Sequence, residues 1–181
     1  MEYSDDELIL LFQDKNKSNY AFNLIVLKYQ KRLYWHIRKI VITHEDTDDI
    51  LQNTFIKALN GLNKFNKESQ LYTWLYRIAT NESLNFLKQK RMKYFLPLVD
   101  VEKQLSETLE SDFYFNGDEL SLKLQKAILT LPKKQRIIFN MRYFDEMKYE
   151  EISAILKITV GALKASFHHA MKKIEKCITE N

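Results

Sequence analysis

The sequence predicts an all-α protein made of two small helical domains joined by a flexible acidic linker. Glycine and proline, which interrupt helices, number only 3 and 2 among 181 residues. Apolar residues recur at steps of three and four over long stretches, which is the period of an amphipathic helix. This period is lost between residues 94 and 117. We therefore expect domains at residues 1–93 and 118–181, with a linker at residues 94–117.

Two helices open the first domain. Residues 4–14 begin with Ser4 followed by Glu7, the pattern of a helix-capping box. Residues 20–42 carry apolar residues at helical steps and form a longer helix. The other face of this longer helix is basic and aromatic, through Lys28, Lys31, Arg32, Tyr34, Trp35 and Arg38.

A third helix is predicted over residues 43–62, with Asp46 or Thr47 as its N-cap. Acidic residues crowd its first turn, where the helix dipole favours them and where a bound cation is the alternative interpretation. Gly61 fits a C-terminal stop. The expected buried stripe is Leu51, Phe55, Leu59 and Leu62, and the opposite face is mixed and exposed, with Asp49, Gln52, Asn53, Ile56 and Lys57.

After a short polar loop, residues 71–91 form a fourth helix. A polar stripe headed by a tryptophan follows one of its faces, which is unusual for a plain solvent-exposed surface. The stripe consists of Trp74, Arg77, Asn81, Asn85 and Lys88.

The second domain ends in two short helices joined by a tight turn. Asp118 is expected to cap its first helix and Pro132 to begin its second. The stretch KYEEISAILKITVGALKASFHHAMKKIEK at residues 148–176 then has the form of a helix-turn-helix, with Lys157 in the turn and Thr159 as the cap of the last helix. Such a motif lays its second helix in the major groove of DNA. Leu120, Leu124, Ile128 and Leu131 are expected to be buried in the first of these helices, and Val160, Leu163, Phe167, Met171 and Ile174 in the last.

The net charge of +4 hides two basic blocks that flank an acidic one. Residues 64–93 hold 7 basic and 2 acidic residues, residues 94–120 hold 1 and 7, and residues 121–181 hold 12 and 6. Two basic surfaces indicate two contacts with a polyanion, although solvated charged faces would give the same counts. The first block also contains aromatic residues, a mixture suited to unpaired bases. Core aromatics beside a solvated basic end are the alternative.

The sequence contains no glycine-rich phosphate loop, no metal-spaced Cys/His set and no nucleophile motif, so we expect no cofactor, no metal and no enzymatic activity. Adjacent His168 and His169 point about 100° apart on a helix and cannot chelate as an i, i+4 pair. The single Cys177 and the acidic N-terminus, with no apolar run of membrane-spanning length, predict a cytoplasmic protein.

Three segments carry a family resemblance: DTDDILQNTFIKAL, FNKESQLYTWLYRIATNESLNFLKQKR and LPKKQRIIFNMRYFDEMKYEEISAILKITVGALKASFHHAMKKI. In order and spacing they resemble the extracytoplasmic-function (ECF) group of bacterial RNA polymerase sigma factors, over nearly the whole chain apart from the linker. The resemblance implies an alternative sigma factor, which directs core polymerase to specific promoters and aids DNA melting at transcription initiation. It also implies that the first domain is sigma region 2 and the second is sigma region 4.

The resemblance assigns roles to individual positions. It implies that the β′ clamp helices of the polymerase contact Asp48, Asp49, Gln52, Asn53 and Phe55. The minus-ten element would contact Phe65, Asn66, Lys67, Glu68, Ser69, Gln70, Trp74, Arg77, Asn81 and Lys88. The minus-thirty-five element would contact Arg136, Lys164, Ala165, His168, His169 and Lys172. Further implied partners are the polymerase β flap and an anti-sigma factor.

The chain departs from the family pattern at several of these positions. Asn53 stands where many members have Glu, Lys148 where a Ser or Thr cap is usual, and Lys157 where the turn usually has Gly. Ala165, His168 and His169 leave the reading helix without the arginines that contact guanine, which favours an A·T-richer or shape-read element. An ordinary duplex-binding helix-turn-helix regulator and a protein whose basic faces bind acidic proteins are the alternative functions.

Overall fold

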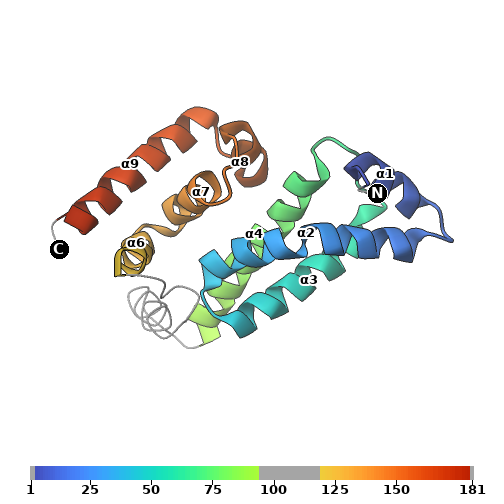
Figure 1. Ribbon diagram of the computed structural model, residues 1–181, viewed down its shortest axis with the longest axis horizontal. Helices are drawn as coiled ribbons and strands as arrows, with labels where there is room; N and C mark the ends of the chain where they lie inside the picture. Colours follow the sequence, from blue (N-terminus) through green and yellow to red (C-terminus); the bar gives the residue numbers. More distant parts are fainter. Residues whose placement is uncertain (1–2, 94–118, 180–181) are drawn as a thin grey trace.

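The computed structural model describes residues 3–93 and 119–179, and these residues are helical apart from the connections between helices. The expected linker at residues 94–117 and the expected cap Asp118 lie outside the described residues. Figure 1 shows α1 to α4 at one end of the molecule and α6 to α9 at the other. The helices are α1 (Asp5–Gln13), α2 (Ser18–Val41), α3 (His44–Leu62), α4 (Leu71–Lys93), α6 (Glu119–Leu129), α7 (Lys133–Tyr143), α8 (Tyr149–Leu156) and α9 (Val160–Thr179).

Helices α1 to α4 form an N-terminal bundle in which α2 packs against the other three. The predicted capping box at its start is confirmed. The Ser4 hydroxyl accepts a hydrogen bond from the Glu7 amide at 3.3 Å, and the Glu7 carboxylate accepts one from the Ser4 amide at 2.7 Å. The hydrogen bond from the Ser4 amide holds the pKa of Glu7 below its usual value.

Helix α3 begins three residues earlier than Thr47, so the predicted N-cap is wrong. Thr43 occupies the cap position instead, and the buried Thr47 hydroxyl donates to the Thr43 carbonyl at 2.6 Å. Gly61 is wrong as a helix stop, because the helix continues to Leu62 and no glycine among the described residues has a positive φ. Gly61 instead faces the Trp74 ring, which a β-carbon at this position would meet at 3.0 Å.

Helices α6 to α9 form a C-terminal bundle in which α9 packs against the other three. The predicted turn between its last two helices is confirmed, since Lys157 adopts the left-handed conformation with φ 56° and ψ 43°. The Thr159 hydroxyl accepts a hydrogen bond from the Ala162 amide at 3.4 Å. The Glu151 carboxylate accepts one from the Lys148 amide at 2.7 Å, which supplies half of a capping box without a hydroxyl at Lys148.

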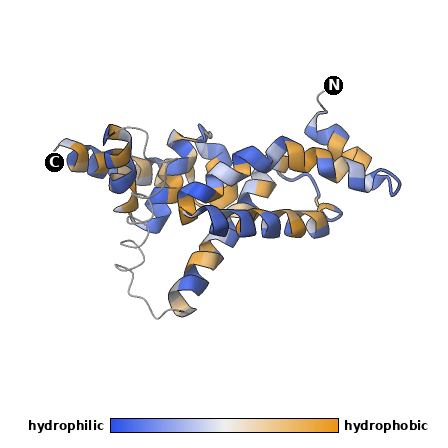
Figure 2. Ribbon diagram, turned by 60° about the horizontal axis from the view of Figure 1, so that its bottom comes forward, coloured by the Kyte–Doolittle hydropathy of each residue, from blue (hydrophilic) through white to orange (hydrophobic). Residues whose placement is uncertain are grey.

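Three predicted core residues are exposed. Leu59 and Met171 each show 40% of their surface to solvent, and Leu120 shows 63%. The buried face of α3 is rotated toward Ile50, Thr54 and Ala58, so Leu59 lies at its margin. Figure 2 shows hydrophobic and hydrophilic residues following one another along the helices, as expected of helices that bury only one face.

The two bundles are in contact and share one apolar core. Helix α8 packs against α4 and α7 packs against α2. A continuous cluster of buried side chains extends from Leu33 and Leu75 in the N-terminal bundle to Met141, Met147 and Ile152 in the C-terminal bundle. A second, smaller cluster lies within the C-terminal bundle alone and includes Leu131, Phe139 and Ile174.

Candidate nucleic-acid interface

Trp74, which heads the polar stripe of α4, lies against the connection between α3 and α4. Its ring is 5.2 Å from the ring of Phe65, centroid to centroid, with the planes inclined at 48°. Gly61 of α3 lets the indole approach the helix backbone. Phe65 and Trp74 are both half-buried, so each ring keeps an exposed part. Such a pair is suited to stacking on an unpaired base.

A cavity of about 420 Å³ opens beside this aromatic pair. One wall is the connection between α3 and α4, and the other is the start of α1. Lys67 in the connection has a backbone φ of 60°, which residues other than glycine rarely adopt. The Lys67 ammonium lies 2.8 Å from the Asp6 carboxylate of α1. The lining residues are Ser4, Asp5, Asp6, Ile9, Phe65, Lys67, Ser69, Gln70 and Leu71.

The remaining predicted minus-ten residues lie in the connection and along α4. Asn66, Glu68 and Gln70 are exposed in the connection, and Asn81 and Lys88 are exposed on α4. Arg77 is half-buried one turn after Trp74. The structure therefore places the predicted strand-binding residues on the connection and on one helix.

The predicted polymerase-binding residues divide into two groups. Asp48, Asp49, Gln52 and Asn53 are exposed along α3 and give it an acidic and amide-rich face. Phe55 is buried at 9% exposure, and its ring packs edge-on against Phe22 at 6.3 Å. Phe55 is therefore a core residue in this structure, and a direct contact through its ring is not supported.

The last helix presents the predicted duplex-reading residues together. Lys164, Ala165, His168, His169 and Lys172 are all exposed on α9. The ammonium of Lys164 lies 5.8 Å from the centre of the Tyr149 ring in α8, which ties the two helices of the motif. Arg136 departs from the prediction of a phosphate contact, because it is only 2% exposed and lies among the buried residues of α7.

A polar network crosses between the bundles, and the sequence analysis did not predict it. The Asp145 carboxylate, in the turn between α7 and α8, contacts two residues of α2: His36 Nδ1 at 3.1 Å and Lys39 Nζ at 2.8 Å. The other ring nitrogen of His36 lies 2.9 Å from the Thr80 hydroxyl of α4. Asn140 donates to the Lys39 carbonyl at 3.3 Å.

Burial and charge compete at this network. The side chains of Asp145 and His36 are only 6% and 1% exposed. Burial by itself would raise the pKa of Asp145, but hydrogen bonds and charges from His36 and Lys39 outweigh it and hold the pKa below its usual value. Burial, with a smaller effect from Asp145, raises the pKa of Tyr76. Burial and a hydrogen bond to Glu151 raise the pKa of Tyr72 to about 12.

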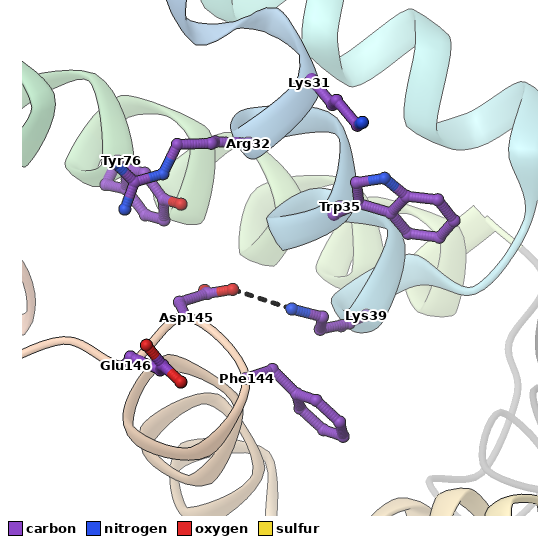
Figure 3. A pocket seen from close by; sticks show the side chains of 8 residues that line it. All are labelled: Lys31, Arg32, Trp35, Lys39, Tyr76, Phe144, Asp145 and Glu146. Atoms are coloured by element: carbon purple, nitrogen blue, oxygen red, sulfur yellow. Dashed lines mark hydrogen bonds and ion pairs between the residues drawn. The ribbon is translucent and has the colours of Figure 1, made fainter.

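The basic and aromatic face of α2, predicted from the sequence without a role, borders this network. Three residues of this face, Lys31, Arg32 and Trp35, line a cavity of about 410 Å³ between the bundles (Figure 3). Arg38 is wrong as a member of the exposed face, because it is only 1% exposed. Asp145 and His36 are 109 positions apart in sequence, so the sequence alone indicates the basic and aromatic pattern of α2 but not its contact with Asp145. The cavity is lined by Lys31, Arg32, Trp35, Lys39 and Tyr76 from the N-terminal bundle and by Phe144, Asp145 and Glu146 from the C-terminal bundle.

Over residues 3–93 and 119–179, no group of three or more His, Cys, Asp or Glu side chains is arranged to hold a metal ion. Within the same residues, no helix combines the length and apolar character needed to cross a membrane.

Models of two protein families match the chain. Sigma-70 region 2 matches residues 25–92, and sigma-70 region 4 matches residues 121–174. The first match covers most of α2 to α4, which carry the aromatic pair and the acidic face. The second covers most of α6, all of α7 and α8 and most of α9, which carries the exposed reading face.

Similar proteins of bacteria bear names in agreement with these families. RNA polymerase sigma-H factor of Pseudomonas aeruginosa is 30% identical, over 96% of this chain and 93% of the relative. ECF RNA polymerase sigma factor SigW of Bacillus subtilis is 32% identical, over 91% of this chain and 92% of the relative. ECF RNA polymerase sigma-E factor of Escherichia coli is 32% identical, over 86% and 85%.

Two solved structures share the fold at 19% sequence identity. CnrH in complex with the cytosolic domain of CnrY has a TM-score of 0.70 and covers 98% of both chains. The sigma factor RpoE in complex with the anti-sigma factor NepR, from Bartonella quintana, has a TM-score of 0.67 and covers 87% of this chain and 96% of that chain. From the two family matches and the identity to these relatives, the chain belongs to the extracytoplasmic-function group of RNA polymerase sigma factors, non-enzymatic initiation factors that direct the polymerase to promoters.

Proposed function

We propose that this sigma factor divides promoter recognition between its two bundles. Residues 1–93 act as region 2, which binds core polymerase and holds the melted minus-ten element, and residues 118–181 act as region 4, which reads the minus-thirty-five element. Residues 94–117 act as the linker. The supporting observation is the separation of two different nucleic-acid surfaces, the aromatic pair of Phe65 and Trp74 beside its cavity and the exposed polar face of α9.

The first surface suits an opened strand. Phe65 and Trp74 offer ring faces for stacking, which tolerates any base. Asn66, Gln70 and Asn81 carry amides that can hydrogen-bond to base edges, and Lys88 can hold a phosphate. The cavity beside the rings is large enough for an extruded base.

The second surface suits intact duplex. Helix α9 presents Lys164, His168, His169 and Lys172 on one exposed side, in the position of a recognition helix. Without an arginine at these positions, bidentate contacts to guanine are absent, and we propose an A·T-richer or shape-read minus-thirty-five element. A binding-site selection with holoenzyme tests this, and a strongly guanine-dependent element at these contacts would contradict it.

The partners follow from the same division. Asp48, Asp49, Gln52 and Asn53 on α3 form the proposed surface for the β′ clamp helices, and region 4 contacts the β flap. The protein would act in the cytoplasm, on the polymerase and promoter DNA. Since the solved structures of similar fold include a sigma factor bound to an anti-sigma factor, we also propose control by such a partner.

A run-off transcription assay with core polymerase over a genomic template pool tests the function. We expect promoter-dependent products with the sigma factor and none with core alone. Trp74→Ala should lower the product yield by about 5- to 150-fold while retaining core binding, because it removes a stacking surface worth about 1–3 kcal/mol per base. Lys15→Ala, an exposed change in the connection between α1 and α2, is the control. Tight duplex binding by the free protein, with no transcript, would favour an ordinary duplex-binding regulator instead.

A further inference from the structure

Three cationic side chains and an indole follow one side of α2. Lys31, Arg32, Trp35 and Lys39 all line the cavity between the bundles. The first and the last are eight positions apart, which is about 12 Å along a helix. Lys31 and Arg32 are exposed, and neither forms an ion pair with any residue that the structure describes. We call these four residues the α2 strip.

The turn between α7 and α8 places two carboxylates against the α2 strip. Asp145 is paired with Lys39, and Glu146 follows it on the same side of the cavity (Figure 3). Glu146 has a φ of 54°, a left-handed conformation that favours glycine. The turn is also fixed by hydrogen bonds from the Asp145 amide to Asn140 O at 3.1 Å and from Arg142 to Met147 O at 3.1 Å.

The α2 strip has the chemistry of a strand-binding surface. Cations spaced over about 12 Å match several consecutive phosphates of a strand that rises about 3.4 Å per nucleotide. An indole among the cations offers a face for a base, the combination found in single-strand binding grooves. Tyr76, which completes this side of the cavity, belongs to α4, the helix that carries the proposed minus-ten contacts.

We propose that the α2 strip binds the phosphate backbone of the opened DNA strand, and that Asp145 and Glu146 occupy its place while the two bundles are closed. Departure of the α7–α8 turn frees Lys39 from Asp145 and removes both carboxylates from the side of the cavity opposite the exposed Lys31 and Arg32. The inference rests on the proposed function, because it adds a third DNA contact to the two already described. It also gives the closed arrangement a role, since region 4 then masks a surface that region 2 needs.

The first test uses holoenzyme and measures how promoter binding depends on salt. Each phosphate contact on a single strand contributes about 0.7 to the slope of log K against log salt concentration. The double variant Lys31→Ala/Arg32→Ala should lower this slope by about 1.4. Lys15→Ala/Lys17→Ala removes the same charge from the exposed connection between α1 and α2 and is the matched control. A slope equal to that of the control would overturn the proposal.

The second test uses the free protein and a labelled oligothymidylate of about 15 nucleotides. Asp145→Asn should bind it several-fold more tightly than the wild type at low salt, and the gain should vanish when Lys31→Ala/Arg32→Ala is added. Circular dichroism verifies that both variants are folded. No gain, or a gain that survives in the triple variant, contradicts the proposal.

A competition experiment separates DNA from an acidic protein as the occupant. Polyglutamate of matched charge should displace the oligothymidylate from the Asp145→Asn variant poorly, because it offers nothing for Trp35 to stack on. Equal displacement would assign the α2 strip to an acidic protein and overturn the proposal. The oligonucleotide tests do not require polymerase, so they give an answer even if the run-off assay shows no promoter-dependent product.

Discussion

At the scale of single residues, the structure shows tertiary contacts of Gly61 and Asp145 that the sequence pattern does not indicate. Gly61 lies inside a helix and needs no unusual backbone angle, but the Trp74 ring occupies the space of its missing side chain. Asp145 lies in a short turn, yet it is buried between a histidine and a lysine of the other bundle. In both cases the partner is remote in sequence.

Gly61→Ala should displace Trp74 without unfolding the protein. The new β-carbon would lie 3.0 Å from ring atom Cζ2, so the indole must move, while alanine gains about 1 kcal/mol of helix propensity. In a Trp35→Phe background, where Trp74 is the remaining tryptophan, we expect a shifted fluorescence maximum and weaker promoter melting. An unchanged spectrum would show that the close approach is not required. Gly161→Ala, where a β-carbon meets nothing within 4 Å, is the control.

Asp145 should make the free energy of unfolding depend on pH in the acidic range. Its pKa is lowered in the folded protein, so ionised Asp145 stabilises the fold above its unfolded pKa of about 3.9, and this contribution is lost as pH falls through the lower folded pKa. Asp145→Asn should cost about 3 kcal/mol near pH 6, because it leaves Lys39 and His36 without their charge partner.

Denaturant unfolding of both proteins from about pH 6 down to about pH 2.5 measures this difference. The gap in unfolding free energy should narrow below about pH 4. Tyr76 of α4 and Glu146 also face Asp145, so Glu146→Gln serves as the control for a neighbouring carboxylate that is exposed. A gap that stays constant to the lowest pH would show that the Asp145 charge does not act.

At the scale of helices, the helix-turn-helix keeps a strained residue at its turn. Lys157 has the left-handed conformation that glycine adopts without cost, and for an L-residue this conformation costs about 1–2 kcal/mol. Two contacts flank this residue: the Lys157 amide donates to the Ser153 carbonyl at 2.9 Å, and the Thr159 hydroxyl accepts from the Ala162 amide at the start of α9.

Lys157→Gly should stabilise the C-terminal bundle by about 0.5–1 kcal/mol, after subtracting the greater freedom of glycine in the unfolded chain. Thermal unfolding measures the gain, and Lys157→Ala, which keeps a β-carbon, should show none of it. If both variants behave alike, the gain comes from loss of the lysine charge rather than from relief of the backbone.

The sequence predicts the helices well but not their rotation about their axes. The capping box at Ser4, the turn at Lys157 and the exposed face of α9 are local features, and all are present in the structure. Leu59 and Met171 match the helical period but fall at the margins of their buried faces, because neighbouring helices determine which part of a stripe is covered. Arg136 has the side chain of a typical surface residue, but it is buried because α7 packs into the C-terminal bundle with this side chain inward.

At the scale of the whole molecule, the bundles are too close for the proposed task. Elements 25 base pairs apart are separated by about 85 Å at 3.4 Å per base pair. In the structure the bundles are in contact through α8 with α4 and α7 with α2, and the longest described helix, α2, has 24 residues and spans about 36 Å. Simultaneous contact with both elements therefore requires the bundles to separate.

Energy transfer between dyes on the two bundles should fall when core polymerase and promoter DNA are added. Cys177→Ser removes the native thiol, and Gln30→Cys with Thr179→Cys places exposed labels on α2 and α9. Asp145→Asn should lower transfer in the free protein, because it weakens the contact that holds the bundles together. Unchanged transfer in the full complex would mean that the closed form itself engages the promoter.

The shared apolar core makes separation of the bundles a matter of solvation as well as of charge. Met141, Met147 and Ile152 are buried in the closed form within the same cluster as Leu33 and Leu75. Opening hydrates part of that cluster at about 25 cal/mol for each Å² of apolar surface exposed. The free energy of binding to the polymerase must therefore offset the cost of hydrating the apolar surface between the bundles. A sigma factor released after initiation would regain that free energy when its bundles close and bury the shared core again. This gain favours dissociation into the closed form over dissociation into an open form with the core exposed to water.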